Sequence, residues 1–216
     1  MSEVSQQKKK EAVVFIHGIW LNGLEMALLR RRVAVADYEC LQFRYRSLSK
    51  TPRENAVRLN QYLSTLDNDV IHLVAHSLGG IVVMHLFHDF PQQKQGRVVL
   101  LASPIHGSQL AEHIFKAGIL RGFLGQSVNQ GLLGNVPQWN SGHDIGMIAG
   151  TKGIGLGVLF APSALEKPND GTVSLSATKS DAIKEHCAVP YSHQGILFAT
   201  PVANRVCHFL NNGTFK

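Results

Sequence analysis

Ser77 has the sequence surroundings of a serine nucleophile. An apolar run, 70–75, leads into His76-Ser77-Leu78-Gly79-Gly80, and a helix-compatible segment, 81–90, follows at once. A strand, a very sharp turn and a helix would place the Ser77 hydroxyl at the apex of the turn, which is the geometry of a nucleophile elbow. The usual elbow pattern is Gly-x-Ser-x-Gly, and Ala75 stands in place of its first glycine. The alternative interpretation is a serine that merely caps a helix.

A serine hydroxyl is a weak nucleophile and needs partners. It requires a base, a group that orients the base, and N–H donors for the oxyanion that develops. His193 is the candidate base because it follows an expected strand and because imidazole titrates near neutral pH. The alternative is an ordinary polar histidine in a loop near a helix start. Other histidines fall before or within expected strands or helices: His72, His85, His88, His186 and His208.

Six apolar or β-branched segments are expected to be the strands that bring these groups together. They are 12–16, 39–45, 70–76, 97–102, 145–149 and 188–191. Strands that alternate with helices predict an α/β fold, with an open, mostly parallel sheet and helices on both faces. Functional groups of such sheets gather outside the carboxyl ends of the strands.

The expected helices have recognisable starts. Asn22 is expected to cap a helix at 23–32. Thr51-Pro52-Arg53-Glu54 combines a cap, a first-turn proline and a glutamate three residues after the cap, so a helix is expected to run to about Leu66. The last helix is expected to start at Thr200.

Length and composition indicate one globular domain over residues 1–216, with 1–11 as a flexible tail. The net charge of +6 is spread along the chain, and no nucleic-acid-binding motif accompanies it, so a nucleic-acid partner is disfavoured. Three cysteines without metal spacing indicate a reducing compartment. Neither a signal peptide nor a segment of membrane-spanning length is visible, so we expect a cytoplasmic protein.

Several short segments together resemble the α/β-hydrolase superfamily, and more narrowly its small bacterial lipases and esterases. The matching segments are 14–19, 75–80, 102–108, 169–173 and 192–195, in the family's order. Some small lipases of this family also carry alanine at the position of Ala75. The combination is specific, although each segment alone is not.

The resemblance implies the order serine, acid, histidine for the catalytic residues. Asp170 follows the expected strand at 145–149 and lies in a segment similar to the family's acid loop, so it is the preferred acid. An Asp-Gly pair is also an ordinary turn signal. Glu166 and Asp181 stay possible as the acid, whereas Asp144 precedes its strand and is expected at the wrong edge.

The resemblance also implies an oxyanion hole of two backbone amides, those of Ile19 and Leu78. Trp20 and Leu21 follow Ile19 and are expected to bind substrate. The glycine-rich, partly apolar segment 108–140 is expected to form a lid or a pocket wall, with plain packing on the sheet as an equal alternative.

No metal and no organic cofactor is expected. His76 and His106 could be considered as metal ligands together with His143 or Asp144. The sequence, however, contains no His-Glu-x-x-His motif with the spacing of metal ligands. The segment 150–157 imitates a nucleotide-binding loop without its Gly-Lys-Ser/Thr ending, so a mobile loop near the site is the preferred interpretation.

The function that the resemblance implies is hydrolysis of carboxylic esters, with a small-molecule or lipid ester as partner. Ser77 would form an acyl-enzyme, His193 would act as base, and Asp170 would orient His193. Thioesterases and acyltransferases use the same triad and stay open as alternatives. A hydrolase-like binding protein without turnover is a further alternative, against which the full set of three residues argues.

Overall fold

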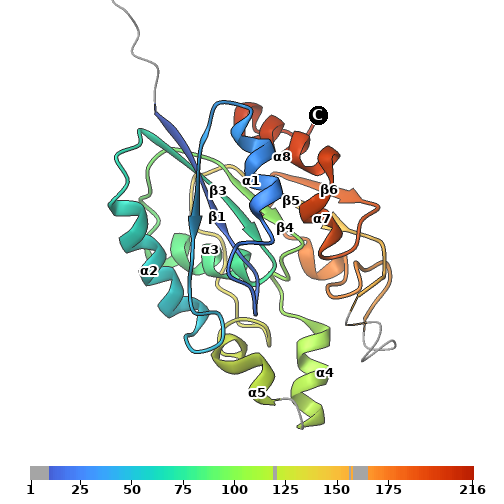
Figure 1. The fold of residues 1–216 in the computed structure, drawn as a ribbon. Helices are drawn as coiled ribbons and strands as arrows, with labels where there is room; N and C mark the ends of the chain where they lie inside the picture. Colours follow the sequence, from blue (N-terminus) through green and yellow to red (C-terminus); the bar gives the residue numbers. More distant parts are fainter. Residues whose placement is uncertain (1–9, 119–120, 156, 158–164) are drawn as a thin grey trace, which may run out of the picture.

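The computed structural model describes residues 10–118, 121–155, 157 and 165–216. Six strands form one sheet in the order β2-β1-β3-β4-β5-β6, and every neighbouring pair is parallel (Figure 1). The expected α/β fold with a mostly parallel sheet is therefore confirmed, and the sheet is parallel throughout. The strands are β1 Glu11–Ile16, β2 Glu39–Phe43, β3 Val70–His76, β4 Val98–Leu101, β5 Ile145–Gly150 and β6 Glu185–Val189.

Helices cover both faces of the sheet. α2 (Pro52–Ser64) and α3 (Leu78–Asp89) pack on one face, against side chains such as those of Val14 and Leu73. α1 (Ala27–Ala34), α7 (Gly195–Phe198) and α8 (Thr200–Asn212) pack on the other face, and α1 and α8 lie side by side (Figure 1). Because successive strand residues point to opposite faces, Val14 of β1 packs in the core on one face and Val13 packs in the core on the other.

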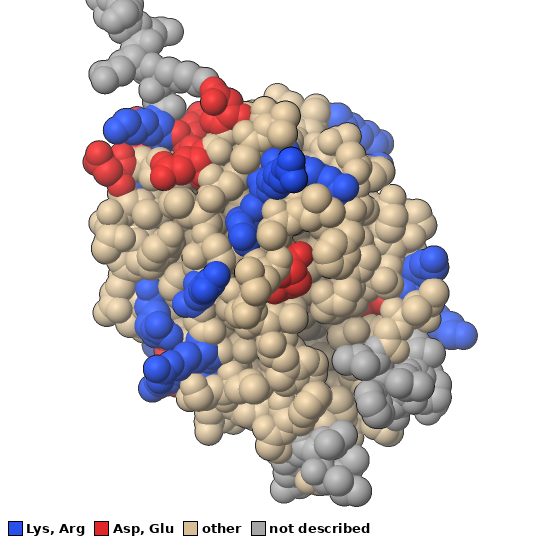
Figure 2. All heavy atoms as spheres, in the orientation of Figure 1, with Lys and Arg blue, Asp and Glu red and all other residues tan. Residues whose placement is uncertain are grey.

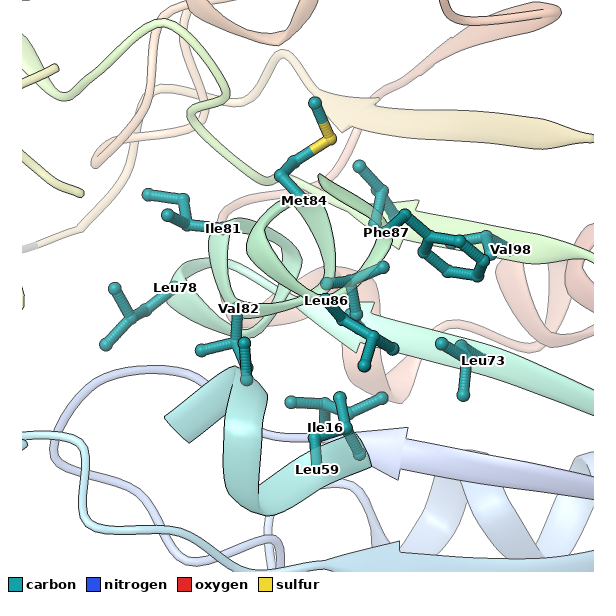
Figure 3. Packing of buried hydrophobic residues seen from close by; sticks show 14 of the residues in the cluster. Ile16, Leu59, Leu73, Leu78, Ile81, Val82, Met84, Leu86, Phe87 and Val98 are labelled. Atoms are coloured by element: carbon teal, nitrogen blue, oxygen red, sulfur yellow. The ribbon is translucent and has the colours of Figure 1, made fainter. Parts of the chain in front are cut away.

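Helix α3 is strongly apolar and begins directly after Ser77. Its residues from Leu78 to Phe87 are all buried. Figure 3 shows its side chains packed against Ile16 of β1, Leu73 of β3 and Leu59 of α2. Such burial fixes the position of the turn that carries Ser77, since the helix cannot shift without opening this core.

The start of α2 agrees with the sequence pattern. The Thr51 side chain accepts a hydrogen bond from the Glu54 amide, and the Glu54 side chain accepts one from the Thr51 amide. A helix is present where α1 was expected, but its expected start was wrong, because it begins at Ala27. Asn22 accepts a hydrogen bond from the Leu24 amide in the loop before it.

The last strand also differs from its expected position. β6 spans Glu185–Val189 and not 188–191, so His186 lies within the strand. β1 begins at Glu11, the last residue of the expected tail, and residues 1–9 of that tail lie outside the described residues.

The segment 108–140 carries α4 (Gln109–Ala117), α5 (Arg121–Leu124) and a short 3-10 helix (Gly125–Val128). In Figure 1 these elements lie at the lower end of the sheet, where the strand arrows point. Within the described ranges, no helix combines the length and the apolar character needed to cross a lipid bilayer.

Candidate active site

Ser77 lies in a strained turn between the end of β3 and the start of α3. Its backbone angles, φ 53° and ψ −122°, are unusual for a residue with a side chain. The Ser77 amide donates a hydrogen bond of 2.9 Å to the carbonyl of Leu101 at the end of β4, which ties the turn to the sheet. Ser77 therefore occupies the strand–turn–helix position that the sequence predicts.

Two glycines allow this turn to approach its neighbours. A Cβ at Gly79 would lie 2.5 Å from the Ile16 carbonyl oxygen, and one at Gly80 would lie 2.1 Å from Ser103 Oγ. Ala75, in contrast, lies within β3 and pairs with Ile16 of β1 and Leu100 of β4. It is fully buried in the core, so its methyl group is accommodated where the usual pattern has glycine.

Asp170 and His193 form a buried hydrogen-bonded pair. His193 Nδ1 lies 2.7 Å from Asp170 Oδ2, and the two side chains are 7% and 2% exposed. The other carboxylate oxygen, Oδ1, accepts hydrogen bonds from the Thr172 and Val173 amides. The His193 amide donates to the backbone carbonyl of Asp170. A carboxylate at Nδ1 favours the tautomer in which Nε2 is free to accept a proton.

The alternatives for the acid lie elsewhere. The Glu166 carboxylate accepts a hydrogen bond from the Ser176 hydroxyl. Asp181 is exposed in a turn before β6. Asp144 pairs with Lys184 and Arg97. The structure thus brings Asp170, and not one of these three residues, to His193.

Ser77 and His193 are both nearly buried, at 5% and 6% exposure. The Ser77 hydroxyl makes no hydrogen bond with a described residue, so the serine–histidine contact of an assembled triad is not formed. Such contacts are often long without substrate and tighten when substrate binds.

The loop after β1 is fixed by His17. His17 Nε2 accepts a hydrogen bond from the Tyr45 amide, so Nδ1 carries the proton and donates to the Gly18 carbonyl at 2.8 Å. The Tyr45 ring stacks on the His17 ring, and the Tyr45 hydroxyl donates to the His17 carbonyl. Burial lowers the pKa of His17, which keeps this neutral tautomer.

This bond also fixes the amide of Ile19. The C=O and N–H of a trans peptide point in opposite directions, so a pinned Gly18 carbonyl sets the direction of the Ile19 N–H. Leu78 is the first residue of α3, and the first four amides of a helix have no partner within it. Sequence patterns give no signal for the Tyr45 contact, because it joins residues 28 apart.

Trp20 and Leu21 both belong to this loop. Trp20 is 39% exposed, and its indole N–H donates a hydrogen bond of 2.7 Å to the Phe123 carbonyl in α5. The Trp20 and Phe123 rings also touch, with centroids 4.4 Å apart. A Cβ at Gly18 would lie 3.5 Å from Leu21 Cδ1, so Leu21 packs over the loop. Trp20 thus joins the loop after β1 to the segment 108–140.

The segment 108–140 is also held by contacts with α3 and with the core on that face of the sheet. His85 of α3 lies 2.6 Å from the Gln130 carbonyl, and the Gln126 amide donates to the Leu48 carbonyl. Leu124 and Leu132 are buried in the core of that face. Part of this segment therefore packs as core, whereas Phe123 is half exposed.

The glycine-rich loop 150–157 lies against the acid loop. A Cβ at Gly150 would lie 2.7 Å from the Cβ of Asp170. The Gly157 amide donates to the Gly171 carbonyl, and the Lys152 amide donates to the Tyr191 carbonyl. The described part of this loop therefore supports the position of Asp170; residue 156 lies outside the described residues.

No metal centre is formed within the ranges that the structure describes: no three His, Cys, Asp or Glu side chains gather in ligand geometry. His106 lies 2.6 Å from the Lys179 carbonyl, and His143 lies 3.0 Å from the Gly96 carbonyl. The His76 ring contacts the ring of His193, with centroids 4.8 Å apart.

The parallel sheet, its strand order and the helices on both faces define an α/β-hydrolase fold, which solved bacterial lipases and esterases share. The chain is similar to the lipase BlEst2 of Bacillus licheniformis in its mature form, with 20% identity, a TM-score of 0.72, and coverage of 96% of this chain and 94% of that chain. It is similar to the metagenomic carboxyl esterase MGS0156, with 18% identity, a TM-score of 0.65, and coverage of 87% and 65%.

A third similar structure is the phospholipase PlaB from Legionella pneumophila, with 17% identity, a TM-score of 0.65, and coverage of 78% of this chain and 45% of that chain. The chain also spans only 51% of the propeptide form of BlEst2. No curated protein matches it. The chain belongs to the family described as a domain of unknown function, DUF7379, which matches residues 1–120.

Proposed function

We propose that the protein is a serine hydrolase that cleaves carboxylic esters through an acyl-enzyme, within a single domain. The observation that carries this proposal is the buried Asp170–His193 pair at the same sheet edge as Ser77 on its strained turn. A protein without turnover has no physical need to hold a nucleophile, an oriented imidazole and a buried carboxylate together.

In the proposed reaction, Ser77 Oγ attacks the ester carbonyl while His193 Nε2 takes its proton. The amides of Ile19 and Leu78 donate hydrogen bonds to the oxyanion of the tetrahedral intermediate. The intermediate collapses, and the leaving alcohol takes the proton from His193. A water then attacks the acyl-enzyme and gives its proton to His193, which returns it to Ser77 as the acid leaves. Asp170 stabilises the imidazolium in both halves.

The surroundings of the site favour an uncharged acyl group. Trp20, Phe123 and Leu48 are apolar and partly exposed, at 39%, 50% and 38%. Figure 2 shows mainly uncharged residues around the position of α5, with Lys and Arg mostly elsewhere on that face. We propose Trp20 and Leu21 as substrate-binding residues and the segment 108–140 as a pocket wall or lid.

The names of the similar structures are lipase, phospholipase and carboxyl esterase, which favours an ester over an amide as substrate. At these low sequence identities the similarity shows a shared fold. Acyl length and leaving group are therefore determined by the assay below.

The proposal is tested with p-nitrophenyl esters of graded acyl length and a fluorophosphonate probe. Wild-type protein should hydrolyse at least one ester and be labelled once, and Ser77→Ala should lose both. Ser103→Ala is the matched control, since Ser103 is a buried serine beside the same turn. Labelling that survives Ser77→Ala would show that Ser77 is not the nucleophile. Labelling of Ser77 without hydrolysis of any ester would favour an acyltransferase or a thioesterase.

The base is tested in the same assay. His193→Ala should abolish hydrolysis, whereas His186→Ala should keep it, because the His186 ring lies 2.9 Å from the Thr178 hydroxyl and makes no bond to Asp170. The opposite result would assign the base to His186.

A further inference from the structure

His76 is a buried histidine that the proposed reaction does not use. It precedes Ser77 in the chain and is 0% exposed. Its Nε2 lies 3.1 Å from the backbone carbonyl oxygen of His193. The sequence offers no signal for this contact, because the two residues are 117 positions apart.

The hydrogen bond assigns the tautomer of His76. A carbonyl oxygen only accepts, so Nε2 must carry the proton and donate. Burial, with a smaller effect of His193, holds the pKa of His76 well below its ordinary value, so the ring is neutral. Nδ1 is then unprotonated and could only accept a hydrogen bond, but it has no hydrogen-bond partner among the described residues. A Cβ at Gly18 would lie only 3.2 Å from this atom, so the space beside it is filled by the loop after β1.

His193 is held at three points, and His76 supplies one of them. The His193 side chain is bound by Asp170 Oδ2, and its amide donates to the Asp170 carbonyl. Both of these contacts lead to the acid loop. Of these three hydrogen bonds, the one from His76 to the His193 carbonyl leads to the turn that carries Ser77, and the two rings also touch there.

We propose that His76 is a positioning residue that fixes the backbone of His193 relative to Ser77, so that base and nucleophile keep the spacing needed for proton transfer. This inference rests on the proposed function. His76 itself touches neither substrate nor a transferred proton. Without its N–H, the loop at His193 would keep its hydrogen bonds to Asp170 and lose its hydrogen bond to the turn at Ser77.

The test compares His76→Gln, which keeps an N–H donor at similar reach, with His76→Leu, which fills the space without a donor. Misplacing reacting groups by about 1 Å costs about 100-fold in rate. We therefore expect kcat of His76→Leu to fall by about 100-fold with KM nearly unchanged, and His76→Gln to recover most of it. His72→Leu is the matched control, because His72 is a buried histidine at the other end of β3. It should lose stability without a fall in kcat.

A second readout does not depend on turnover. The NMR signal of the His193 Nδ1 proton reports its bond to Asp170 and should be sharp in wild type and His76→Gln, and broadened by exchange in His76→Leu. If this pattern holds while no ester is hydrolysed, the positioning stands and the proposed function fails. Equal losses of kcat in the Gln and Leu variants would overturn the donor role. A His76→Leu variant with unchanged kcat and an unchanged signal would also overturn it.

Discussion

The backbone of Ser77 is held in a strained conformation by its surroundings. Its φ of 53° and ψ of −122° suit glycine, and such a conformation costs other residues about 1–3 kcal/mol. The core around α3 and the bond from the Ser77 amide to Leu101 hold the turn in place. Strain of this kind is kept where a side chain must project from a tight turn.

Ser77→Gly should therefore be more stable than Ser77→Ala, although both lack the hydroxyl. Glycine adopts the observed angles without steric strain, whereas alanine keeps its Cβ. We expect the midpoint of urea unfolding to be higher for Ser77→Gly. Equal midpoints would mean that the turn relaxes when the hydroxyl is removed.

Asp170→Asn should inactivate the protein without unfolding it. Because Oδ1 accepts two backbone N–H groups, the amide oxygen of the introduced asparagine would stay there and its NH₂ group would face His193 Nδ1. An N–H donor at that position moves the imidazole proton to Nε2, which then cannot accept the Ser77 proton in the proposed reaction. On the proposed mechanism we expect kcat to fall on the order of 10⁴-fold, the loss that this replacement causes in a Ser-His-Asp triad.

The control for this variant is Asp181→Asn, which changes an exposed carboxylate and should leave kcat unchanged. Circular dichroism checks that both variants fold. A nearly active Asp170→Asn would assign the acid to another residue.

At the level of single residues, the sequence singles out Ser77, Asp170 and His193 as candidates because each follows a strand within a recognisable local pattern. Contacts that join distant segments cannot be read from it. The bond between His76 and His193 and the stack of His17 on Tyr45 depend on how the strands assemble, and no local pattern encodes them.

Asp170 lies where β5 and the loop after β6 approach each other closely. Gly150 ends β5, and a Cβ there would lie 2.4 Å from the Tyr191 carbonyl oxygen and 2.7 Å from the Cβ of Asp170. The strand is thus packed against the backbone of the loop after β6 and against the side chain of Asp170.

Gly150→Ala should displace Asp170 and lower kcat, with a smaller loss of overall stability. The matched control is Gly142→Ala, since a Cβ at Gly142 meets nothing within 4 Å. Hydrolysis rates and thermal unfolding of both variants check this. An active Gly150→Ala would show that the acid loop shifts without cost to the site.

The errors of the sequence-based prediction concern the bounds of individual helices and strands. β6 is an edge strand whose residues, apart from Val189, are only partly buried or exposed, so its pattern lacks the continuous apolar run that marks β1 or β4. The sequence pattern places α1 at 23–32, but a Cβ at Gly23 would meet the Gln42 side chain, and the loop turns there before the helix begins.

Across the described part of the molecule, several buried or half-buried histidines are held in a neutral state. Burial lowers the pKa of each below its ordinary value of 6.5: His17, His72, His76, His85 and His186. A histidine with a lowered folded pKa binds its proton more readily in the unfolded chain. Its contribution to stability is therefore present above pH 6.5 and is lost as pH falls below that value.

We expect the free energy of unfolding to fall steeply as the pH drops below 6.5. The slope should exceed that of one titrating group, which is about 1.4 kcal/mol per pH unit. Urea unfolding at a series of pH values measures it. His76→Gln should have a shallower slope than wild type, and a flat profile over this range would contradict the assigned neutral states.

The close packing around the two glycines after Ser77 has a consequence for the evolution of the family. Gly79 faces the Ile16 and His17 carbonyls, which no substitution nearby can remove, so homologous sequences should keep glycine there. Gly80 faces the Ser103 side chain, which a mutation can shorten. Positions 80 and 103 should therefore vary together, with a larger residue at one only where the other is small.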